Sequence, residues 1–313
     1  MNNKQEALQK HQEWQGKIEV ISRVSLEKSH DLSVSYTPGV AVAAKKVVSQ
    51  NYNIKIKRRR FKMITKKVEN LPVKIFDTRE EMGVDSAALA AEIINKAIAE
   101  KGVANVVFAA APSQDDLLKE LLVQDIDWTK VRAFHQDEYI GIDDKEPAGF
   151  GNFLNRAIFD KVDFMEKHYL LCEADKAEEK CEEYTKLLTE YPIDLIFLGI
   201  GENGHLAFND PAVADFEDPK MIKVVELDDV CRQQQVNDGC FATLNDVPKQ
   251  AMSLTMSFIM SVPHAICVVP TIRKANAVYN ALLGPVTTAC PASILRKHQD
   301  AVLYLDKDSA SKL

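Results

Sequence analysis

Short apolar runs alternate with amphipathic stretches along the chain from Met63 onward. Seven runs rich in branched and aromatic residues predict β-strands, at 73–76, 105–110, 131–135, 194–200, 222–226, 265–270 and 301–305. Apolar residues at helical spacing predict helices between them, at 86–101, 114–123, 174–191 and 273–283. The run DLIFLGI is apolar almost throughout, as in strands buried on both faces. The pattern therefore predicts an α/β fold with a mainly parallel sheet covered by helices on both faces.

The first 62 residues have a different pattern. Residues 1–15 form a predicted polar helix, and residues 51–62 lack apolar periodicity and form a predicted basic linker. Residues 1–62 carry a net charge of +8 and the remainder −15, which together make the −7 of the 313-residue chain. This asymmetry indicates two pieces of different origin. We therefore expect a small, mostly helical fragment with its linker at 1–62 and a separate domain at 63–313.

Composition narrows the function classes. The chain is 46% hydrophobic and 27% charged, as in globular proteins, and no apolar run approaches the roughly 18–20 residues of a membrane span. The N-terminus shows no apolar signal-peptide core. We expect a cytoplasmic protein with no membrane partner. An acidic body of this charge also argues against a nucleic-acid partner, because binding phosphates needs clustered Lys and Arg.

The six cysteines predict neither disulfides nor a metal site. They are widely spaced, and the chain has no CxxC pair and no Cys/His group at zinc-finger spacing. Reduced, mostly buried thiols are the simpler interpretation. We expect no metal ion.

Polar residues follow the predicted strands where each strand ends. These residues are Ser113, Asp137, Glu138, His205, Asp210, Arg273 and Lys274. Ligands of such sheets bind at the carboxyl ends of the strands, so we expect these side chains to lie around one pocket. Asp137, His205 and Asp210 would form an acid–base set, in which one carboxylate orients the imidazole and stabilises its cation. A single Asp-Glu pair can equally be a surface feature or a helix cap.

Three of the 12 glycines fall within six residues, at Gly199, Gly201 and Gly204. The spacing matches G-x-G-x-x-G, but no ribose-binding acid follows at the usual distance, so a dinucleotide site is not indicated. The glycines more plausibly let backbone amides approach an anionic or sugar ligand. We expect no cofactor.

Five motifs then suggest a family. They are FHQDEYIGI (134–142), GFGNFL (149–154), GIGENGHLAFNDP (199–211), VPKQAMSLT (247–255) and PASILRKH (291–298). With these motifs, residues from about 63 to 313 resemble the glucosamine-6-phosphate deaminase/isomerase family, whose fold 6-phosphogluconolactonases share. The resemblance implies a Rossmann-like αβα sandwich, a small-molecule sugar phosphate as substrate, and proton-transfer chemistry without metal or redox cofactor. The AFNDP segment is similar to the deaminase branch.

The resemblance also implies catalytic roles. Asp137 matches the base that moves a proton between C2 and C1, and His205 matches the histidine that assists ring opening. Asp210 takes the place of a supporting glutamate, one methylene shorter. Asn203 stands where the family usually has an aspartate, and because an amide cannot titrate, the relay must differ here. The neighbouring Glu202 is a weaker candidate for that role.

The phosphate site departs further from the family pattern. The family's Thr/Gly-rich loop is replaced by AAAPSQ (109–114), which leaves Ser113 as its one hydroxyl. Lys274 matches a phosphate-binding lysine, whereas a second family cation falls on Asn237. We include Arg232, which would reach the phosphate only through the fold. The resemblance also places Gly201 and Gly204 among the substrate-binding residues.

The N-terminal segment resembles a different family. Residues 6–41, with Tyr36 in a YTPGV motif, are similar to the start of bacterial malic enzymes, in which this tyrosine is a catalytic acid. The lysine, metal carboxylates and NAD domain of those enzymes have no counterpart downstream. Residues 1–62 are therefore interpreted as a fused fragment, and Tyr36 as non-catalytic.

We expect an amino-sugar-phosphate isomerase/deaminase. The alternatives are a sugar-lactone hydrolase similar to 6-phosphogluconolactonase, and a non-catalytic sugar-phosphate-binding relative, which Asn203 and the altered loop suggest. The sequence leaves the sugar epimer, allostery and a homo-oligomeric state open.

Overall fold

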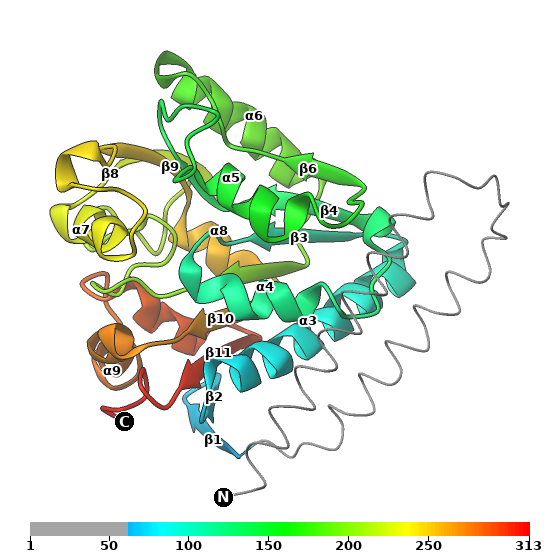
Figure 1. Ribbon diagram of the computed structural model, residues 1–313, viewed down its shortest axis with the longest axis vertical. Helices are drawn as coiled ribbons and strands as arrows, with labels where there is room; N and C mark the ends of the chain where they lie inside the picture. The colour runs from blue at the N-terminus through cyan, green and yellow to red at the C-terminus, as the bar shows by residue number, and fades with distance from the viewer. Residues whose placement is uncertain (1–61) are drawn as a thin grey trace, which may run out of the picture. The chain divides into compact units, whose positions relative to one another are not determined.

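The computed structural model describes residues 62–313, whose larger sheet has eight strands in the order β1-β2-β11-β10-β7-β3-β4-β6 (Figure 1). The strands are β1 (Met63–Val68), β2 (Leu71–Phe76), β3 (Ala104–Phe108), β4 (Val131–His135), β6 (Glu166–His168), β7 (Leu195–Leu198), β10 (His264–Val269) and β11 (Ala301–Asp306). Every neighbouring pair is parallel except β1 and β2. The predicted α/β fold with a mainly parallel sheet is confirmed.

A second, antiparallel sheet lies at the site end of the fold. It has three strands in the order β5-β9-β8, which are β5 (Asp137–Tyr139), β9 (Gln250–Leu254) and β8 (Ile222–Glu226). The run 222–226, counted above among the strands of the main sheet, belongs to this one. The short strand β5 carries Asp137 opposite Ser253. The base candidate therefore sits on regular backbone rather than on a free loop.

Helices cover both faces of the main sheet. They are α3 (Arg79–Lys101), α4 (Asp115–Leu121), α5 (Phe150–Leu154), α6 (Ala177–Glu190), α7 (Asp229–Asn237), α8 (Met256–Ser261) and α9 (Ala275–Leu283). Alternate strand residues point to opposite faces. Phe108 and Phe197 pack in one buried cluster with α3, α4 and α5, whereas Val107 and Ile196 pack in another with α6, α8 and α9. The two clusters are the cores of an αβα sandwich.

Helix α3 begins seven residues earlier than the pattern predicts, and this places Arg79 at the site. Thr78 caps the helix, because its hydroxyl accepts a hydrogen bond from the Glu81 N–H. Gly83 permits the close crossing of α3 over α4, since a Cβ at this position would lie 2.8 Å from the Asp116 carbonyl carbon. The apolar pattern starts only beyond this capped, polar first turn.

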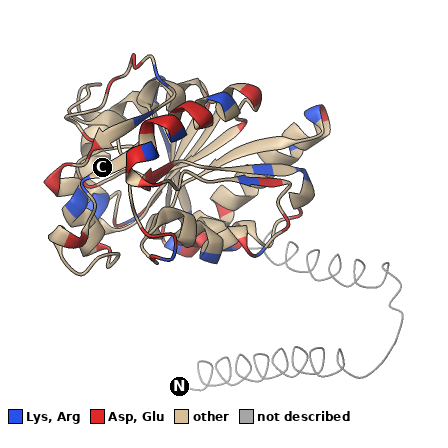
Figure 2. Cartoon of the chain, turned by 90° about the horizontal axis from the view of Figure 1, so that it is seen from above, with Lys and Arg blue, Asp and Glu red and all other residues tan. Residues whose placement is uncertain are grey.

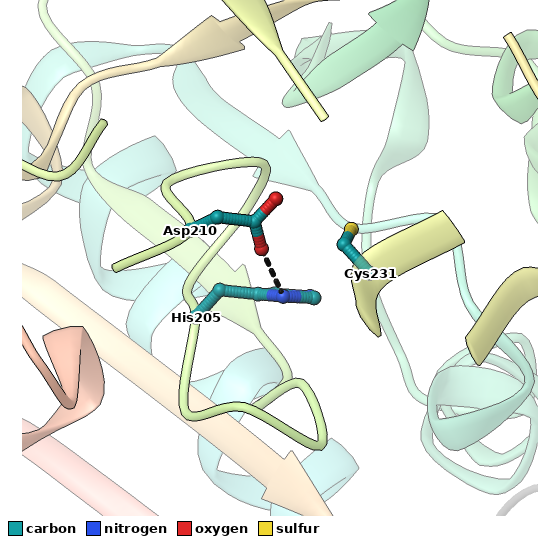
Figure 3. Close-up of side chains that lie close together, drawn as sticks. All are labelled: His205, Asp210 and Cys231. Carbon is teal, nitrogen blue, oxygen red and sulfur yellow. Dashed lines mark ion pairs between the residues drawn. The ribbon is translucent and has the colours of Figure 1, made fainter. Parts of the chain in front are cut away.

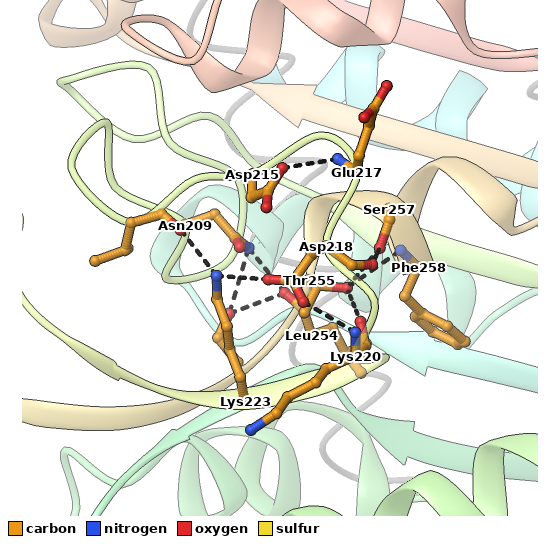
Figure 4. A network of polar contacts seen from close by, with 12 residues as sticks. Asn209, Asp215, Glu217, Asp218, Lys220, Lys223, Leu254, Thr255, Ser257 and Phe258 are labelled. Carbon is orange, nitrogen blue, oxygen red and sulfur yellow. Dashed lines mark hydrogen bonds and ion pairs between the residues drawn. The ribbon is translucent and has the colours of Figure 1, made fainter.

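A polar network fixes the segment that follows the AFNDP motif (Figure 4). The Lys223 ammonium lies 2.7 Å from the Asp218 carboxylate, and Ser257 Oγ donates to the Asp218 carbonyl at 2.6 Å. Thr255 Oγ1 donates to the Lys220 carbonyl at 2.7 Å. Closer to the site, the Asn209 amide donates to the Leu254 carbonyl at 2.8 Å. These bonds tie the chain on either side of residue 210 to β8 and β9.

Lys and Arg positions are interspersed with Asp and Glu positions along the ribbon of residues 62–313 (Figure 2). Within the same residues, every helix is too short or too polar to cross a membrane. The predictions for 1–61, including the helical fragment, the malic-enzyme resemblance and Tyr36, fall outside the described residues. The division of the chain at 62/63 stays a prediction.

Candidate active site

A cavity of about 350 Å³ opens at the carboxyl ends of the parallel strands. Five of the predicted site residues line it, namely Ser113, Asp137, Gly201, His205 and Lys274. They follow four different strands of the main sheet, so the fold brings together positions far apart in the sequence. Four other predicted residues lie outside the lining of the cavity. They are Asn203, Gly204, Asp210 and Arg232.

Asp137 lies at the wall of the cavity with almost no solvent contact, at 6% exposure. Its carboxylate makes no hydrogen bond or ion pair with any side chain of residues 62–313. Burial raises its pKa well above the ordinary aspartate value, and the charge of the neighbouring Glu138 adds to the shift. An unpaired carboxylate held in this way is suited to accept a proton from a bound ligand.

Glu138, the other acid of the predicted pair, has a structural role. Its two oxygens accept hydrogen bonds from the N–H groups of Tyr139, Phe150 and Gly151 at 2.9–3.0 Å, which fixes the start of α5 beside β5. His135 is fully buried under the same turn, and burial lowers its pKa to about 3, so it is neutral. Asp137 therefore lines the cavity, whereas Glu138 stabilises the backbone that forms its wall.

His205 and Asp210 form the expected pair, with the ring Nδ1 2.9 Å from the Asp210 Oδ1 (Figure 3). The ring N–H does not point along this line, so the contact is an ion-pair contact rather than an aligned hydrogen bond. Burial opposes ionisation of Asp210, but the contacts from His205, the Asn203 amide and the Asp228 N–H outweigh it and lower its pKa. Asp210 is thus an anion held beside the ring, where it can orient the imidazole.

Asn203 lies behind this pair rather than in the cavity. Its side-chain amide donates to Asp210 Oδ1 at 2.9 Å and to Asp228 Oδ2 at 3.2 Å, while its carbonyl oxygen accepts from the His205 N–H at 3.1 Å. Glu202 does not substitute for it, because its carboxylate faces Arg273 at 4.0 Å. Asn203 therefore positions both members of the pair without titrating.

The glycines of the GIGENGH segment make room for His205. A Cβ at Gly201 would lie 2.2 Å from the imidazole Cε1 and Nε2 atoms. Gly204 has a φ of 89°, and its Cβ would lie 2.7 Å from Cys290 Sγ, so it shapes the loop and does not line the cavity. Gly201 thus supports the ring, and Gly204 supports the loop that carries it.

A short turn after β10 points Lys274 into the cavity. Thr271 has a φ of 81°, a conformation that non-glycine residues rarely adopt, and its N–H is held by the Asp306 carboxylate at 2.9 Å. The turn continues as a 3₁₀ segment, Ile272–Lys274, which leaves Lys274 8% exposed. Burial lowers the pKa of its ammonium, and the charges of Asp238 and Glu202 oppose this shift. Ser113 completes this side from the loop after β3.

Arg232 does not reach the cavity. Its guanidinium donates to the carbonyls of Leu244 and Val247 at 2.6 and 3.1 Å and pairs with Asp229 at 3.0 Å. It fastens α7 to the segment that follows, so we leave it out of the proposed phosphate site. The position of Asn237 is approached instead by Arg273, whose guanidinium donates to the Asn237 carbonyl at 3.0 Å.

Three arginines line the cavity: Arg273, which was expected at this edge of the sheet, and Arg79 and Arg156, which were not predicted as site residues. Arg79 donates to the Pro112 carbonyl at 2.9 Å and so adjoins the AAAPSQ loop. Arg273 pairs with Asp238 at 2.9 Å. Arg79 follows the end of a predicted strand, which was a usable signal, whereas Arg156 lies inside a helical stretch that gives none.

Comparison with known proteins agrees with the motifs. A family model described as glucosamine-6-phosphate isomerases/6-phosphogluconolactonase matches residues 77–304. A glucosamine-6-phosphate deaminase of Listeria welshimeri is 36% identical over 241 residues, which are 77% of this chain and 100% of the relative. A protein of the same name from Streptococcus gordonii is 30% identical over 229 residues, covering 73% of this chain and 95% of the relative.

Solved structures give the same result. A monomeric glucosamine-6-phosphate deaminase matches with a TM-score of 0.69 at 27% identity, covering 77% of this chain and 99% of that one. A 6-phosphogluconolactonase from Shewanella baltica matches with a TM-score of 0.62 at 18% identity over 78% and 99% of the two chains, a likeness of fold alone. The resemblance inferred from the motifs is confirmed, and the chain belongs to the glucosamine-6-phosphate isomerase/6-phosphogluconolactonase family.

Proposed function

We propose that this protein is a glucosamine-6-phosphate deaminase, which converts an amino-sugar phosphate and water into a ketose phosphate and ammonia. The observation that carries the proposal is that Asp137 and His205 line one cavity, with His205 backed by Asp210. Relatives named for this activity, at 36% and 30% identity, support the deaminase over the lactonase reading. The family model covers both activities, whereas the solved lactonase structure, at 18% identity, supports a likeness of fold alone.

Asp137 is the proposed base for the isomerisation. Its carboxylate takes a proton from C2 of the open-chain sugar and returns it to C1. A second proton passes from the C2 amine to the C1 oxygen, so the aldehyde becomes a hydroxymethyl group and the amine becomes an imine. Water adds to the imine carbon, and ammonia leaves as the C2 carbonyl forms. A carboxylate without a hydrogen-bonding partner in a buried wall is a stronger base than a solvated one, because its charged form is poorly stabilised.

His205 is the proposed acid–base group for opening the sugar ring. Ring opening moves a proton from the C1 hydroxyl to the ring oxygen, and an imidazole can carry it near neutral pH. Asp210 stabilises the imidazolium that forms in between, and Asn203 holds Asp210 in place. The three side chains act as one unit, although only the imidazole contacts the ligand.

The substrate class follows from the charge of the cavity. Its lining contains four permanent or near-permanent cations, Arg79, Arg156, Arg273 and Lys274, against the two acids Asp137 and Asp238. An excess of positive charge in a small, partly enclosed cavity favours a phosphate ester over a neutral sugar. We assign the phosphate to Lys274 and Ser113, which line the same cavity as the acid–base residues.

Ammonia release tests the proposal. The purified chain is incubated with glucosamine-6-phosphate, galactosamine-6-phosphate or 6-phosphogluconolactone, and ammonia and lactone consumption are followed. We expect ammonia from at least one amino sugar, and a loss of at least about 100-fold in kcat for Asp137→Asn. Asp163→Asn, on an exposed aspartate away from the cavity, is the matched control. Lactone turnover without ammonia would establish the hydrolase instead, and sugar-phosphate binding without turnover would establish a non-catalytic relative.

A further inference from the structure

Three side chains with metal-binding atoms converge behind the cavity wall, namely His205, Asp210 and Cys231 (Figure 3). An imidazole nitrogen, a carboxylate oxygen and the cysteine Sγ lie within 4.8 Å of one another, and all three residues are buried. Cys231 comes from the first turn of α7, and the other two from the loop after β7. The spacing of these three residues in the sequence matches no metal-binding motif, because only the fold places α7 beside the loop after β7.

The protein engages these donor atoms in part, since Asp210 Oδ1 accepts from the Asn203 amide at 2.9 Å. The His205 Nδ1 is close to Asp210 but makes no aligned hydrogen bond, so its lone pair or proton is not committed. Burial raises the pKa of the Cys231 thiol well above its usual value, and the charges of the nearby Asp210 and Asp228 add to the shift. Asp210 Oδ2 has one long contact, 3.3 Å from the Asp228 N–H. Three donors thus face a common centre.

We propose that His205, Asp210 and Cys231 bind Zn²⁺, and that the bound ion switches the deaminase off. The ligand types are those that zinc takes in proteins: one imidazole, one carboxylate and one thiolate. The thiol S–H bond breaks, its proton passes to solvent and a Zn–S bond forms, with no change of oxidation state. One thiolate and one carboxylate then balance the two charges of the ion, which suits a buried site.

The geometry fits after a small contraction. Ligands at about 2.0–2.3 Å around a tetrahedral ion are about 3.5 Å apart, so donor atoms within 4.8 Å need only side-chain adjustments to meet it. The His205 ring lines the cavity, which gives the ion a path inward and leaves water for its fourth position. Three protein ligands and one open position are the pattern of accessible zinc sites.

Occupation of this site blocks the acid–base unit. A zinc ion on His205 Nδ1 replaces the proton that the imidazolium needs, and it draws Asp210 away from the ring. The inhibition rests on the proposed function, whereas the binding does not. Zinc binding and zinc inhibition are therefore measured separately, and we expect a chelator to reverse both.

The test uses the full chain, freed of metal, with zinc chloride as the probe. Ammonia release is followed against free zinc for the wild type, Cys231→Ser and the control Cys172→Ser, a half-buried thiol outside the cavity lining. Binding is followed independently by the cobalt(II) absorption spectrum, in which a thiolate ligand gives a charge-transfer band. We expect inhibition of the wild type and Cys172→Ser at equal zinc, at least about tenfold weaker inhibition of Cys231→Ser, and a thiolate band that only Cys231→Ser lacks.

Other results overturn the proposal. Equal zinc sensitivity of the wild type and Cys231→Ser would place the inhibitory ion elsewhere, and absence of the cobalt–thiolate band in the wild type would exclude the site. A chain without deaminase activity that still shows the band, lost in Cys231→Ser, would refute the proposed function and leave the metal site standing. If Cys231→Ser fails to fold, the cobalt band in the wild type and its loss on adding excess zinc decide the matter.

Discussion

The side-chain amide of Asn203 lies between two carboxylates, 2.9 Å from Asp210 Oδ1 and 3.2 Å from Asp228 Oδ2. The same residue accepts the backbone N–H of His205 at 3.1 Å. A donor is therefore required on one side of this residue and an acceptor on the other. Asparagine satisfies both, which explains how the unit holds together without the aspartate that the family pattern implies at this position.

Asn203→Asp is expected to damage the protein rather than restore a relay. The new carboxylate would face Asp210 and Asp228 at hydrogen-bond distance, so one of the three must take up a proton or move. We expect a loss of about 1–3 kcal/mol in the free energy of unfolding at pH 7 and a fall in kcat of at least about tenfold. Urea titration and ammonia release measure the two effects.

Asn203→Ala is the comparison for that variant, because it removes the amide without adding charge. We expect Asn203→Ala to lower the free energy of unfolding and kcat less than Asn203→Asp does. Activity of Asn203→Asp at or above the wild-type level would show that an aspartate works here, and would contradict the role assigned to the amide.

Gly201→Ala is expected to displace the catalytic imidazole. An added Cβ would lie 2.2 Å from two ring atoms of His205, far inside contact distance, so the ring must rotate away from the cavity. A displacement of about 1 Å at a reacting group costs about 100-fold, and we expect a fall in kcat of that size. Gly199→Ala is the comparison for kcat, since its Cβ would meet the Ser113 hydroxyl of the proposed phosphate site at 3.1 Å, which affects KM, and would leave the ring in place. Similar losses in the two variants would refute this explanation.

Lys274→Met is expected to weaken substrate binding more than chemistry. Removing a charge-assisted contact to the phosphate costs about 1.5–3 kcal/mol, which corresponds to a rise in KM of about 10–100-fold with little change in kcat. Because burial lowers the pKa of this ammonium, KM in the wild type should also rise on the alkaline side sooner than for an ordinary lysine. Lys307→Met, on an exposed lysine, is the control. A KM unchanged by Lys274→Met would place the phosphate elsewhere, with Arg79 as the next candidate.

The positions of most strands along the chain and the main site residues were predictable from the sequence, since they depend on local patterns, whereas the order of the strands in the sheet was not predicted. The apolar runs marked seven strands, and residues after their ends supplied Ser113, Asp137, His205 and Lys274. Four strands were missed for physical reasons. Strands β5 and β6 have three residues each, β1 is a polar and exposed edge, and β9 lies within the VPKQAMSLT motif, which was not assigned to a strand.

What the sequence could not supply was the partner of each polar side chain. Arg232 was included as a candidate phosphate ligand, yet its guanidinium donates to the Leu244 carbonyl, whereas Arg273 lines the cavity. Cys231 lies in a polar helix with no local sign that Asp210 would lie beside it. Such pairings depend on packing between distant segments, which spacing and composition do not encode.

Asp137→Asn is expected to abolish activity and to stabilise the fold. In the wild type the carboxylate must be ionised to act as a base, so kcat/KM should fall as the pH drops through a pKa well above that of an ordinary aspartate. The same raised pKa means that the folded state holds this proton more tightly than the unfolded state. Stability due to Asp137 is therefore greatest at acidic pH and declines as the pH rises through the folded-state pKa.

Asparagine cannot ionise, so the Asp137→Asn variant does not lose stability in this way as the pH rises. We expect Asp137→Asn to match the wild type in stability near pH 4 and to exceed it by about 0.5–2 kcal/mol at pH 8, as when a strained active-site group is relieved. Thermal unfolding of both proteins across this pH range measures the difference, and Asp163→Asn should show none. A stability difference that does not depend on pH would mean that Asp137 is ionised at little cost, and the acidic limb of kcat/KM would then belong to another group.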